Sequence, residues 1–205
     1  MKRLALIGAG LLLPLSQSFA GEIYLTLQAG MATGDTNASQ LDSQLASAGL
    51  NANASSSDDS RTAWRLGMGY QITPNWAVEL SQVELGKVTT RFSGMAIDIN
   101  NFLTSVSDIH PQTAEGWQLS GLYRHLLAEK SWVVARAGLF DWHSDYTLSE
   151  GSVTRNVTAS GKSGTYGVGV EVKLRERLRV GVNYDRYSID SEAISMVSAG
   201  ITYGL

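Results

Sequence analysis

Apolar and polar residues alternate along eight separate stretches of this chain. A period of two residues sends successive side chains to opposite faces, which is the pattern of a β-strand that lies between two unlike surroundings. The stretches are residues 22–34, 61–72, 76–86, 115–126, 131–142, 163–174, 178–185 and 196–205. The pattern therefore predicts an all-β protein built from eight strands.

The connections between these strands alternate in length. Residues 35–60, 87–113, 143–162 and 186–195 are predicted to be polar loops, and residues 73–75, 128–130 and 175–177 to be tight turns. The segment 95–106 in the second loop is compatible with a short amphipathic helix. Long loops at one end and tight turns at the other are typical of transmembrane β-barrels, whose long loops lie outside the cell. Both chain ends are then expected in the periplasm.

Alternation alone does not say which face of each strand meets lipid. A soluble ligand-binding barrel of the lipocalin type has the same period with its apolar face turned inward. Here the polar face is rich in glycine, which weakens a water-exposed strand but leaves room for long side chains inside a narrow barrel. We therefore predict that the apolar face meets lipid and that isolated charges line the interior. These charges are Arg65, Glu79, Arg124, Arg136, Glu171, Lys173 and Arg179.

Aromatic residues on the apolar face support this choice. Trp64 and Tyr70 lie six residues apart on one strand, and Trp117 and Tyr123 repeat the spacing on another. Amphipathic rings near both edges of an apolar band are typical of the aromatic girdles of membrane barrels. The predicted girdle comprises Trp64, Tyr70, Trp76, Trp117, Tyr123, Tyr166, Tyr184 and Tyr203.

The faces of the stretch 131–142 stay undecided from the sequence. Trp132 and Trp142 share their parity with Arg136, although tryptophan is expected outside and arginine inside. A β-bulge between them would reconcile the two.

The first 20 residues have the features of a secretory signal peptide. Lys2 and Arg3 precede an apolar run over 4–15 and a small-residue site that ends at Ala20. This order predicts cleavage after Ala20 and a single barrel domain over residues 21–205. Beyond the leader no run of about 18 apolar residues occurs, so a membrane span must be made by strands.

The amino-acid composition argues against several structural features and one class of partner. The chain has no cysteine, which excludes a disulfide framework and a lipid anchor on a processed N-terminal cysteine. Loss of the leader leaves 14 Lys and Arg against 19 Asp and Glu, a net charge of −5, which argues against a nucleic-acid partner.

The last stretch, 196–205, alternates up to its final residue. It resembles the C-terminal strand of bacterial outer-membrane barrels, although Leu205 stands where these barrels carry an aromatic residue. With the leader, eight strands, alternating loops and glycine-rich lining, the chain resembles the small outer-membrane barrels of Gram-negative bacteria, namely the transmembrane domain of OmpA, OmpX and Ail. The resemblance implies an eight-stranded antiparallel up-and-down transmembrane β-barrel with long extracellular loops and short periplasmic turns. It also implies contact with outer-membrane lipid and lipopolysaccharide, and assembly by the barrel-assembly machinery through the C-terminal strand.

The interior charges allow two interpretations. The resemblance to OmpA-type barrels implies a gated ion path in which Glu79 exchanges partners among Arg65, Arg124 and Arg136. The alternative is a satisfied network that plugs the lumen. We favour the plug, because eight strands leave an interior that side chains nearly fill and an unpaired charge there is costly.

Enzymatic chemistry has little support in the sequence. His143, Ser144 and Asp145 invite comparison with a hydrolase, but adjacent residues of a strand point to opposite faces and a catalytic pair must meet. The His-x-Ser pattern of outer-membrane lipid A deacylases is absent, and His110 and His125 form no metal-ligand cluster. We therefore predict no catalytic, metal or cofactor site.

Rigid barrels most often act through the loops that they display. The sequence thus favours a surface-exposed interaction or adhesion protein, or an envelope-integrity protein, that meets a host or surface ligand through its loops. The alternatives are a narrow low-conductance channel gated by the interior charges and, third, an outer-membrane lipid-modifying enzyme.

Overall fold

The computed structural model describes residues 21–34, 52–56, 60–86, 90–94, 114–150, 153–189 and 192–205. Its strands are β1 (Ile23–Gly34), β2 (Ala52–Ser56), β3 (Ser60–Gln71), β4 (Trp76–Glu84), β5 (Thr90–Gly94), β6 (Glu115–Ala128), β7 (Ser131–Glu150), β8 (Val153–Arg175), β9 (Leu178–Ile189) and β10 (Glu192–Gly204). The predicted leader, 1–20, and the segment 95–106 lie outside the described residues. No helix in the described part of the chain is long and apolar enough to cross a membrane.

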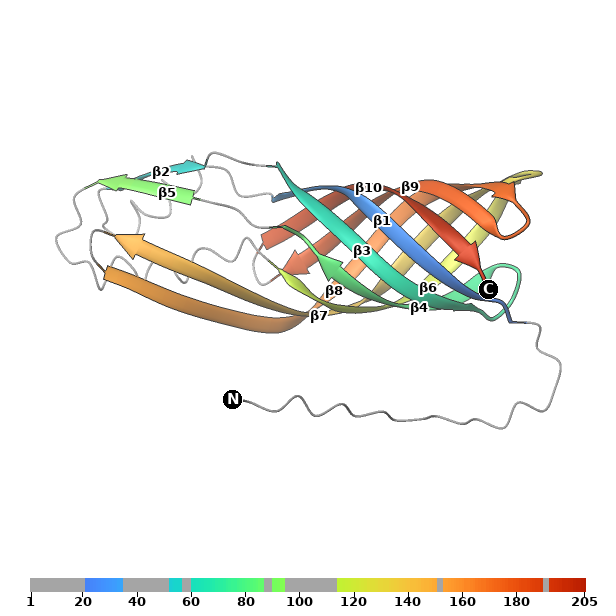
Figure 1. The fold of residues 1–205 in the computed structure, drawn as a ribbon, viewed down its shortest axis with the longest axis horizontal. Helices are drawn as coiled ribbons and strands as arrows, with labels where there is room; N and C mark the ends of the chain where they lie inside the picture. Colours follow the sequence, from blue (N-terminus) through green and yellow to red (C-terminus); the bar gives the residue numbers. More distant parts are fainter. Residues whose placement is uncertain are drawn as a thin grey trace, which may run out of the picture.

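Eight of the strands close into a barrel in the order β1-β10-β9-β8-β7-β6-β4-β3 (Figure 1). Every neighbouring pair in this order is antiparallel, including β1 with β10 and β1 with β3. The pairing of β1 with β10 runs from Tyr24↔Gly204 to Gly34↔Ile194, so the first and last strands seal the sheet. The predicted eight-stranded up-and-down barrel is confirmed.

The two ends of the barrel differ. The short connections 72–75, 129–130 and 176–177 lie at one end together with Leu205, and we call it the turn end (Figure 1). The long connections leave from the opposite end, which we call the loop end. Gly86 follows β4 there with a φ of 77°, a left-handed conformation that glycine adopts without steric cost.

Strands extend further at the loop end than the sequence predicts. The predicted loop 143–162 is wrong, because β7 and β8 stay paired through this region up to Glu150↔Val153. The predicted loop 186–195 is also wrong, because β9 and β10 pair up to Ile189↔Glu192. Residues 143–162 show no apolar alternation, because outside lipid neither face of a strand must be apolar. In 186–195 the apolar side chains Tyr187, Ile189 and Ile194 are instead buried inside the barrel. Within the first two predicted loops, β2 and β5 pair as a small separate sheet.

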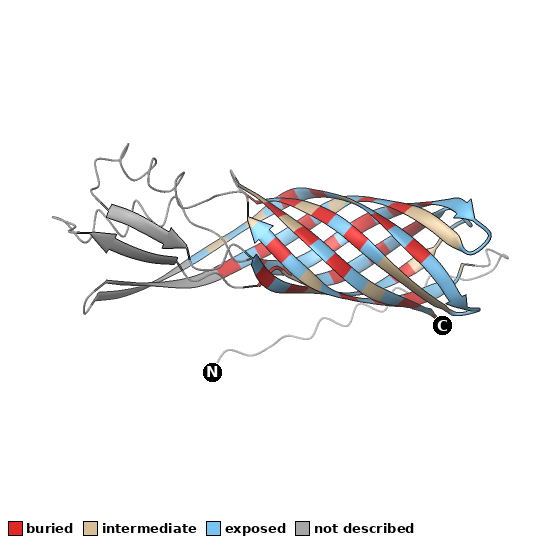
Figure 2. Cartoon of the chain, turned by 90° about the horizontal axis from the view of Figure 1, so that it is seen from above, coloured by how far each residue is buried: buried red, intermediate tan, exposed pale blue. Residues whose placement is uncertain are grey.

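The burial of the barrel strands follows the predicted faces. Buried and exposed residues alternate along them (Figure 2), and the exposed ones include large apolar side chains such as Leu27 and Met68. The buried ones include charged side chains such as Arg65 and Glu79. An apolar outside and a polar inside match a membrane barrel and exclude the lipocalin alternative.

The structure also decides the faces of β7. Trp142 is buried inside the barrel on the same face as Arg136. The β7–β8 pairing runs without interruption past both residues, so no bulge separates them. The register irregularity beside β7 lies instead at the turn end, between Leu126 and Ala128 of β6.

Arginine at Met68 tests the lipid-facing assignment. Met68 is 54% exposed on the outside of β3, opposite Leu25 and Leu80. We expect Met68→Arg to lower the free energy of unfolding from lipid vesicles by about 2–4 kcal/mol, because a cation at the bilayer midplane is costly. The control Met68→Leu conserves volume and should cost less than about 1.5 kcal/mol. Equal stability of the two variants, measured by urea titration, would place Met68 outside the lipid.

Candidate functional site

Four charged side chains form a compact network in the middle of the lumen, which we call the central network. Asp185 of β9 forms ion pairs with Arg65 of β3 and Arg136 of β7, each with a nitrogen–oxygen distance of 3.0 Å. Arg136 also lies 3.5 Å from the carboxylate of Glu79 on β4. All four side chains are nearly inaccessible to solvent. Two arginines face two carboxylates, so the central network is electrically balanced.

Neutral side chains add hydrogen bonds to the central network, whereas Arg65 Nε, Arg136 Nε and Asp185 Oδ2 have no hydrogen-bond partner among the described residues. Arg65 donates hydrogen bonds to the amide oxygen of Gln28 at 2.9 Å and to the hydroxyl of Tyr187. The carboxylate of Glu79 accepts from Ser81 at 3.0 Å and from Tyr24 at 3.3 Å. Buried charges are tolerated when they are paired and hydrogen-bonded, and each of the four side chains has an ion-pair partner and at least one hydrogen bond.

A second group of charged side chains, which we call the turn-side cluster, lies on the turn-end side of the central network. Glu171 accepts from Arg124 at 3.2 Å and lies 3.7 Å from Arg179. Both guanidinium groups lie over the ring of Tyr24, at 5.0 and 5.7 Å from its centroid. Because the Tyr24 hydroxyl reaches Glu79, this ring links the turn-side cluster to the central network.

One predicted interior residue does not join either group. Lys173 is exposed at the turn end of β8, and no ion pair among the described residues includes it. It shares inward parity with Glu171, but the register of β8 with β9 shifts between Lys173 and Arg175. The prediction that Lys173 belongs to an interior charge network is therefore wrong. Its side chain is exposed at the turn end.

Apolar side chains close the lumen at the loop end. This apolar plug comprises Ala32, Ala63, Val83, Leu85, Ala114, Phe140, Trp142, Tyr187, Ile189, Ile194 and Met196. Phe140 and Tyr187 pack edge to face at a centroid distance of 5.3 Å. The Trp142 indole N–H donates to the hydroxyl of Ser163 at 2.8 Å, so the polar atom of this buried ring is satisfied. The plug places a mainly apolar layer between the central network and the loop end, in which the buried Arg61 donates to the carbonyl of Leu85.

Glycines make the space that these side chains occupy. A Cβ at Gly167 would collide with the carboxylate of Asp185, and one at Gly69 would collide with the ring of Tyr24. Even a small side chain at Gly69 would displace Tyr24 from Glu79 and from the two arginines. The glycines of the lining therefore leave room for particular side chains, here those of Asp185 and Tyr24.

Sequence reasoning missed the residue at the centre of the network. Asp185 binds both Arg65 and Arg136, yet it stands near the end of the predicted strand 178–185. Asp185 follows Gly181 and Asn183 at intervals of two residues, so the alternation could have placed its side chain on the inward face. Gln28, Gln118 and Tyr24 were also missed, because alternation shows that they face inward but not which side chain they meet. Tyr187 was missed because it lies in the predicted loop 186–195.

The predicted girdle residues all occupy outward positions, in two groups. Tyr70, Trp76, Tyr123 and Tyr203 lie toward the turn end, where Trp76 and Tyr123 pair across β4 and β6 with centroids 4.9 Å apart. Trp64, Trp117, Tyr166 and Tyr184 lie further toward the loop end. There the Trp64 indole donates to Glu84 at 2.8 Å.

The His143 region does not assemble a catalytic pair in the structure. His143 faces outward and lies 2.9 Å from the carboxylate of Glu115, whereas Ser144 is buried on the opposite face. Among the described residues no group of His, Cys, Asp or Glu could hold a metal ion.

Removal of the charge at Asp185 tests the central network. We expect Asp185→Asn to lower the free energy of unfolding in detergent by about 3 kcal/mol or more, because Arg65 and Arg136 lose their shared counter-charge inside the barrel. Lys173→Gln, at the exposed turn end, should change it by less than about 0.5 kcal/mol. Similar losses for the two variants would show that the pairing at Asp185 does not stabilise the barrel.

Single cysteines test whether the plug excludes water, because the chain has no cysteine of its own. We expect Ala63→Cys, inside the plug, to resist a water-soluble maleimide in the folded barrel, while Lys173→Cys reacts rapidly. Refolded wild-type protein should likewise give no stepwise current in planar bilayers. Equal labelling of the two cysteines, or stepwise current, would instead support a water-filled channel.

Comparisons with known proteins agree with the barrel geometry. The β-barrel of Neisserial surface protein A superposes with a TM-score of 0.55 at 12% identity, covering 89% of this chain and 97% of that chain. The N-terminal β-barrel domain of Pseudomonas aeruginosa OprF superposes with a TM-score of 0.50 at 12% identity, covering 90% and 99%. At such identities the likeness shows the fold alone. A search of curated protein sequences finds no match.

The family model for the OmpA-like transmembrane domain matches residues 19–203, nearly the whole chain. This match agrees with the closed barrel, the apolar exterior and the charged lumen. The chain is thus a bacterial outer-membrane β-barrel protein that belongs to the OmpA-like transmembrane domain family.

Proposed function

We propose that this barrel is a surface-exposed interaction protein that acts through the elements at its loop end, in adhesion to a host or surface ligand or in envelope integrity. The observation that carries the proposal is the hairpin of β7 and β8, which extends beyond the other strands of the barrel (Figure 1). We call residues 144–164 the protruding hairpin.

The protruding hairpin has sheet edges that the rest of the barrel does not cover. The pairing of β6 with β7 ends at Glu115↔His143, and that of β8 with β9 ends at Thr165↔Tyr187. Because β9 turns into β10 at Ile189↔Glu192, it cannot follow β8 further. Within the described part of the chain, no strand other than β7 pairs with residues 153–164 of β8. A free sheet edge can accept an extended strand of a partner through backbone hydrogen bonds.

The barrel beneath the hairpin suits a rigid support better than a conduit. The central network joins β3, β4, β7 and β9 across the lumen, and the apolar plug fills the lumen above it. Ion movement through this lumen would require both layers to open. The structure therefore favours an interaction protein over a gated channel.

The proposal also states which side of the outer membrane each end of the barrel faces. The turn end faces the periplasm and the loop end faces the outside of the cell, with the lipopolysaccharide leaflet around the loop-side half of the barrel. Residues 1–20 act as the signal peptide of a barrel domain over 21–205. The last strand, β10, is the segment that the barrel-assembly machinery recognises, and its pairing with β1 completes closure. No enzymatic activity is part of this proposal.

Shortening of the protruding hairpin tests the proposed function. Asp145 and Thr158 face each other across the hairpin, so residues 146–157 can be replaced by an Asn-Gly turn without change of register. We expect bacteria that display the shortened barrel to attach to cultured epithelial cells or matrix-coated plates no better than bacteria without the protein. Folding should be unchanged, as shown by the slower gel mobility of the barrel after boiling.

Two controls make this result interpretable. Met68→Leu, a lipid-facing change, should leave attachment unchanged, and all strains are compared at equal surface amounts of protein. Normal attachment combined with greater detergent sensitivity of the cells would assign the hairpin to envelope integrity. Unchanged attachment and unchanged detergent resistance would contradict the proposal.

A further inference from the structure

The outer rim of the turn end is divided into two chemically different arcs. The aromatic arc consists of Tyr70, Trp76, Tyr123 and Tyr203, on β3, β4, β6 and β10. These strands are contiguous in the barrel through β1. Aromatic side chains of this kind sit at the level of lipid head groups and anchor a barrel there. The remaining strands, β7, β8 and β9, contribute none of the predicted girdle residues at this end.

Basic residues occupy the part of the rim to which the predicted girdle contributes no residue. Lys130, Lys173, Arg175 and Arg177 form this basic arc, and all four are exposed. The Lys173 backbone N–H donates to the carbonyl of Lys130 at 2.8 Å, so the two turns of the arc are neighbours. The carbonyl of Arg177 accepts from Gly204 of β10, where the aromatic arc begins. The two arcs together therefore encircle the turn end.

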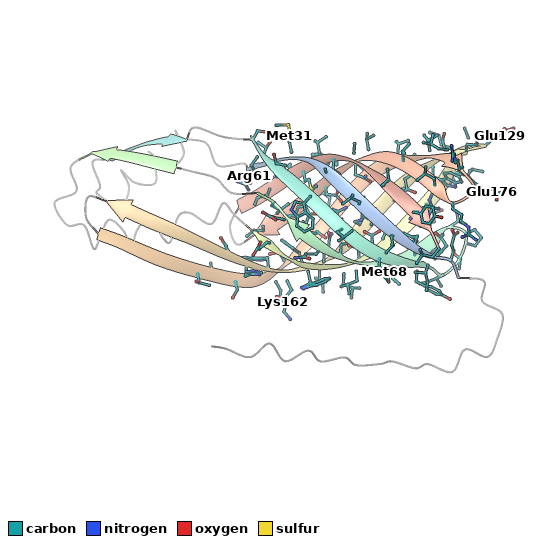
Figure 3. All side chains as sticks on the ribbon, in the orientation of Figure 1. Met31, Arg61, Met68, Glu129, Lys162 and Glu176 are labelled. Carbon is teal, nitrogen blue, oxygen red and sulfur yellow. The ribbon has the colours of Figure 1, made fainter. Side chains whose placement is uncertain are left out.

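The cations of the basic arc lack ion-pair partners in the described part of the chain. No ion pair among the described residues includes any of the four. Glu129 and Glu176 stand in the same turns (Figure 3), which leaves the arc with an excess of two positive charges. The opposite turn, 72–75, carries no charged residue. Positive charge at the turn end is thus concentrated on one side.

Exposed leucines lie beside the basic arc. Leu126, Leu127 and Leu174 have exposed fractions of 54%, 65% and 59%. Cationic side chains next to exposed aliphatic ones match a phospholipid, whose phosphate meets the cations while its acyl chains cover the leucines. A soluble anionic polymer would leave the leucines uncovered.

We propose that the basic arc binds the head groups of anionic phospholipids in the leaflet that surrounds the turn end. The aromatic arc anchors one side of the barrel by amphipathic rings, and the basic arc anchors the other by charge. This inference rests on the outer-membrane location of the barrel and does not depend on a ligand at the loop end. Loss of one activity therefore leaves the other intact.

Lipid binding to the detergent-refolded full-length barrel tests the basic arc. Native mass spectrometry would compare retention of phosphatidylglycerol with retention of zwitterionic phosphatidylcholine at equal concentration. We expect wild type to retain more phosphatidylglycerol, and Lys173→Gln/Arg175→Gln to reduce that preference roughly fivefold or more. The preference should also fall as salt increases.

A matched control separates a local site from net charge. Lys162→Gln/Arg186→Gln removes the same charge from the loop-side half, where Lys162 lies 3.7 Å from Asp141 (Figure 3), and should keep the preference. If the first variant does not fold, Lys130→Gln/Arg177→Gln places both changes in the turns and takes its place. No preference in wild type, an equal loss in the control, or full preference in the folded arc variants would overturn the proposal.

Discussion

A backbone N–H or C=O in the hydrocarbon layer has no water to bind, so each must pair with another strand. The closure of β10 on β1 satisfies this requirement for the first and last strands, and the remaining features of the barrel depend on it. A closed sheet with a period of two sends every second side chain into a narrow interior. Apolar residues face lipid, and the polar residues must find partners inside.

The side chains inside the lumen are arranged in three layers along the barrel. At its centre, Arg65 and Arg136 share Asp185, and amides and hydroxyls from neighbouring strands add further hydrogen bonds. Above them the apolar plug fills the lumen. Below them Arg124 and Arg179 share Glu171 near the mouth. The interior therefore stabilises strand positions across the barrel, which makes the barrel a firm base for what it displays.

The two ends of the same barrel face different chemistry. At the loop end, β7 and β8 continue as a paired hairpin beyond their pairing with β6 and β9. At the turn end, rings on one side and cations on the other meet the head groups. Glu171, enclosed in the lumen, is paired with Arg124, whereas Lys173, exposed at the turn end, is in no ion pair among the described residues.

The sequence by itself determined the number of barrel strands, their antiparallel order and, for every barrel strand except β7, the face that it turns to lipid, because alternation and turn residues are local properties of the chain. Only the tertiary structure decided that Asp185 joins Arg65 and Arg136, that Lys173 lies outside, and that Trp142 faces inward. These outcomes depend on the register of strands that are distant in sequence. The protruding hairpin also escaped the sequence, because beyond the lipid neither face of a strand must be apolar.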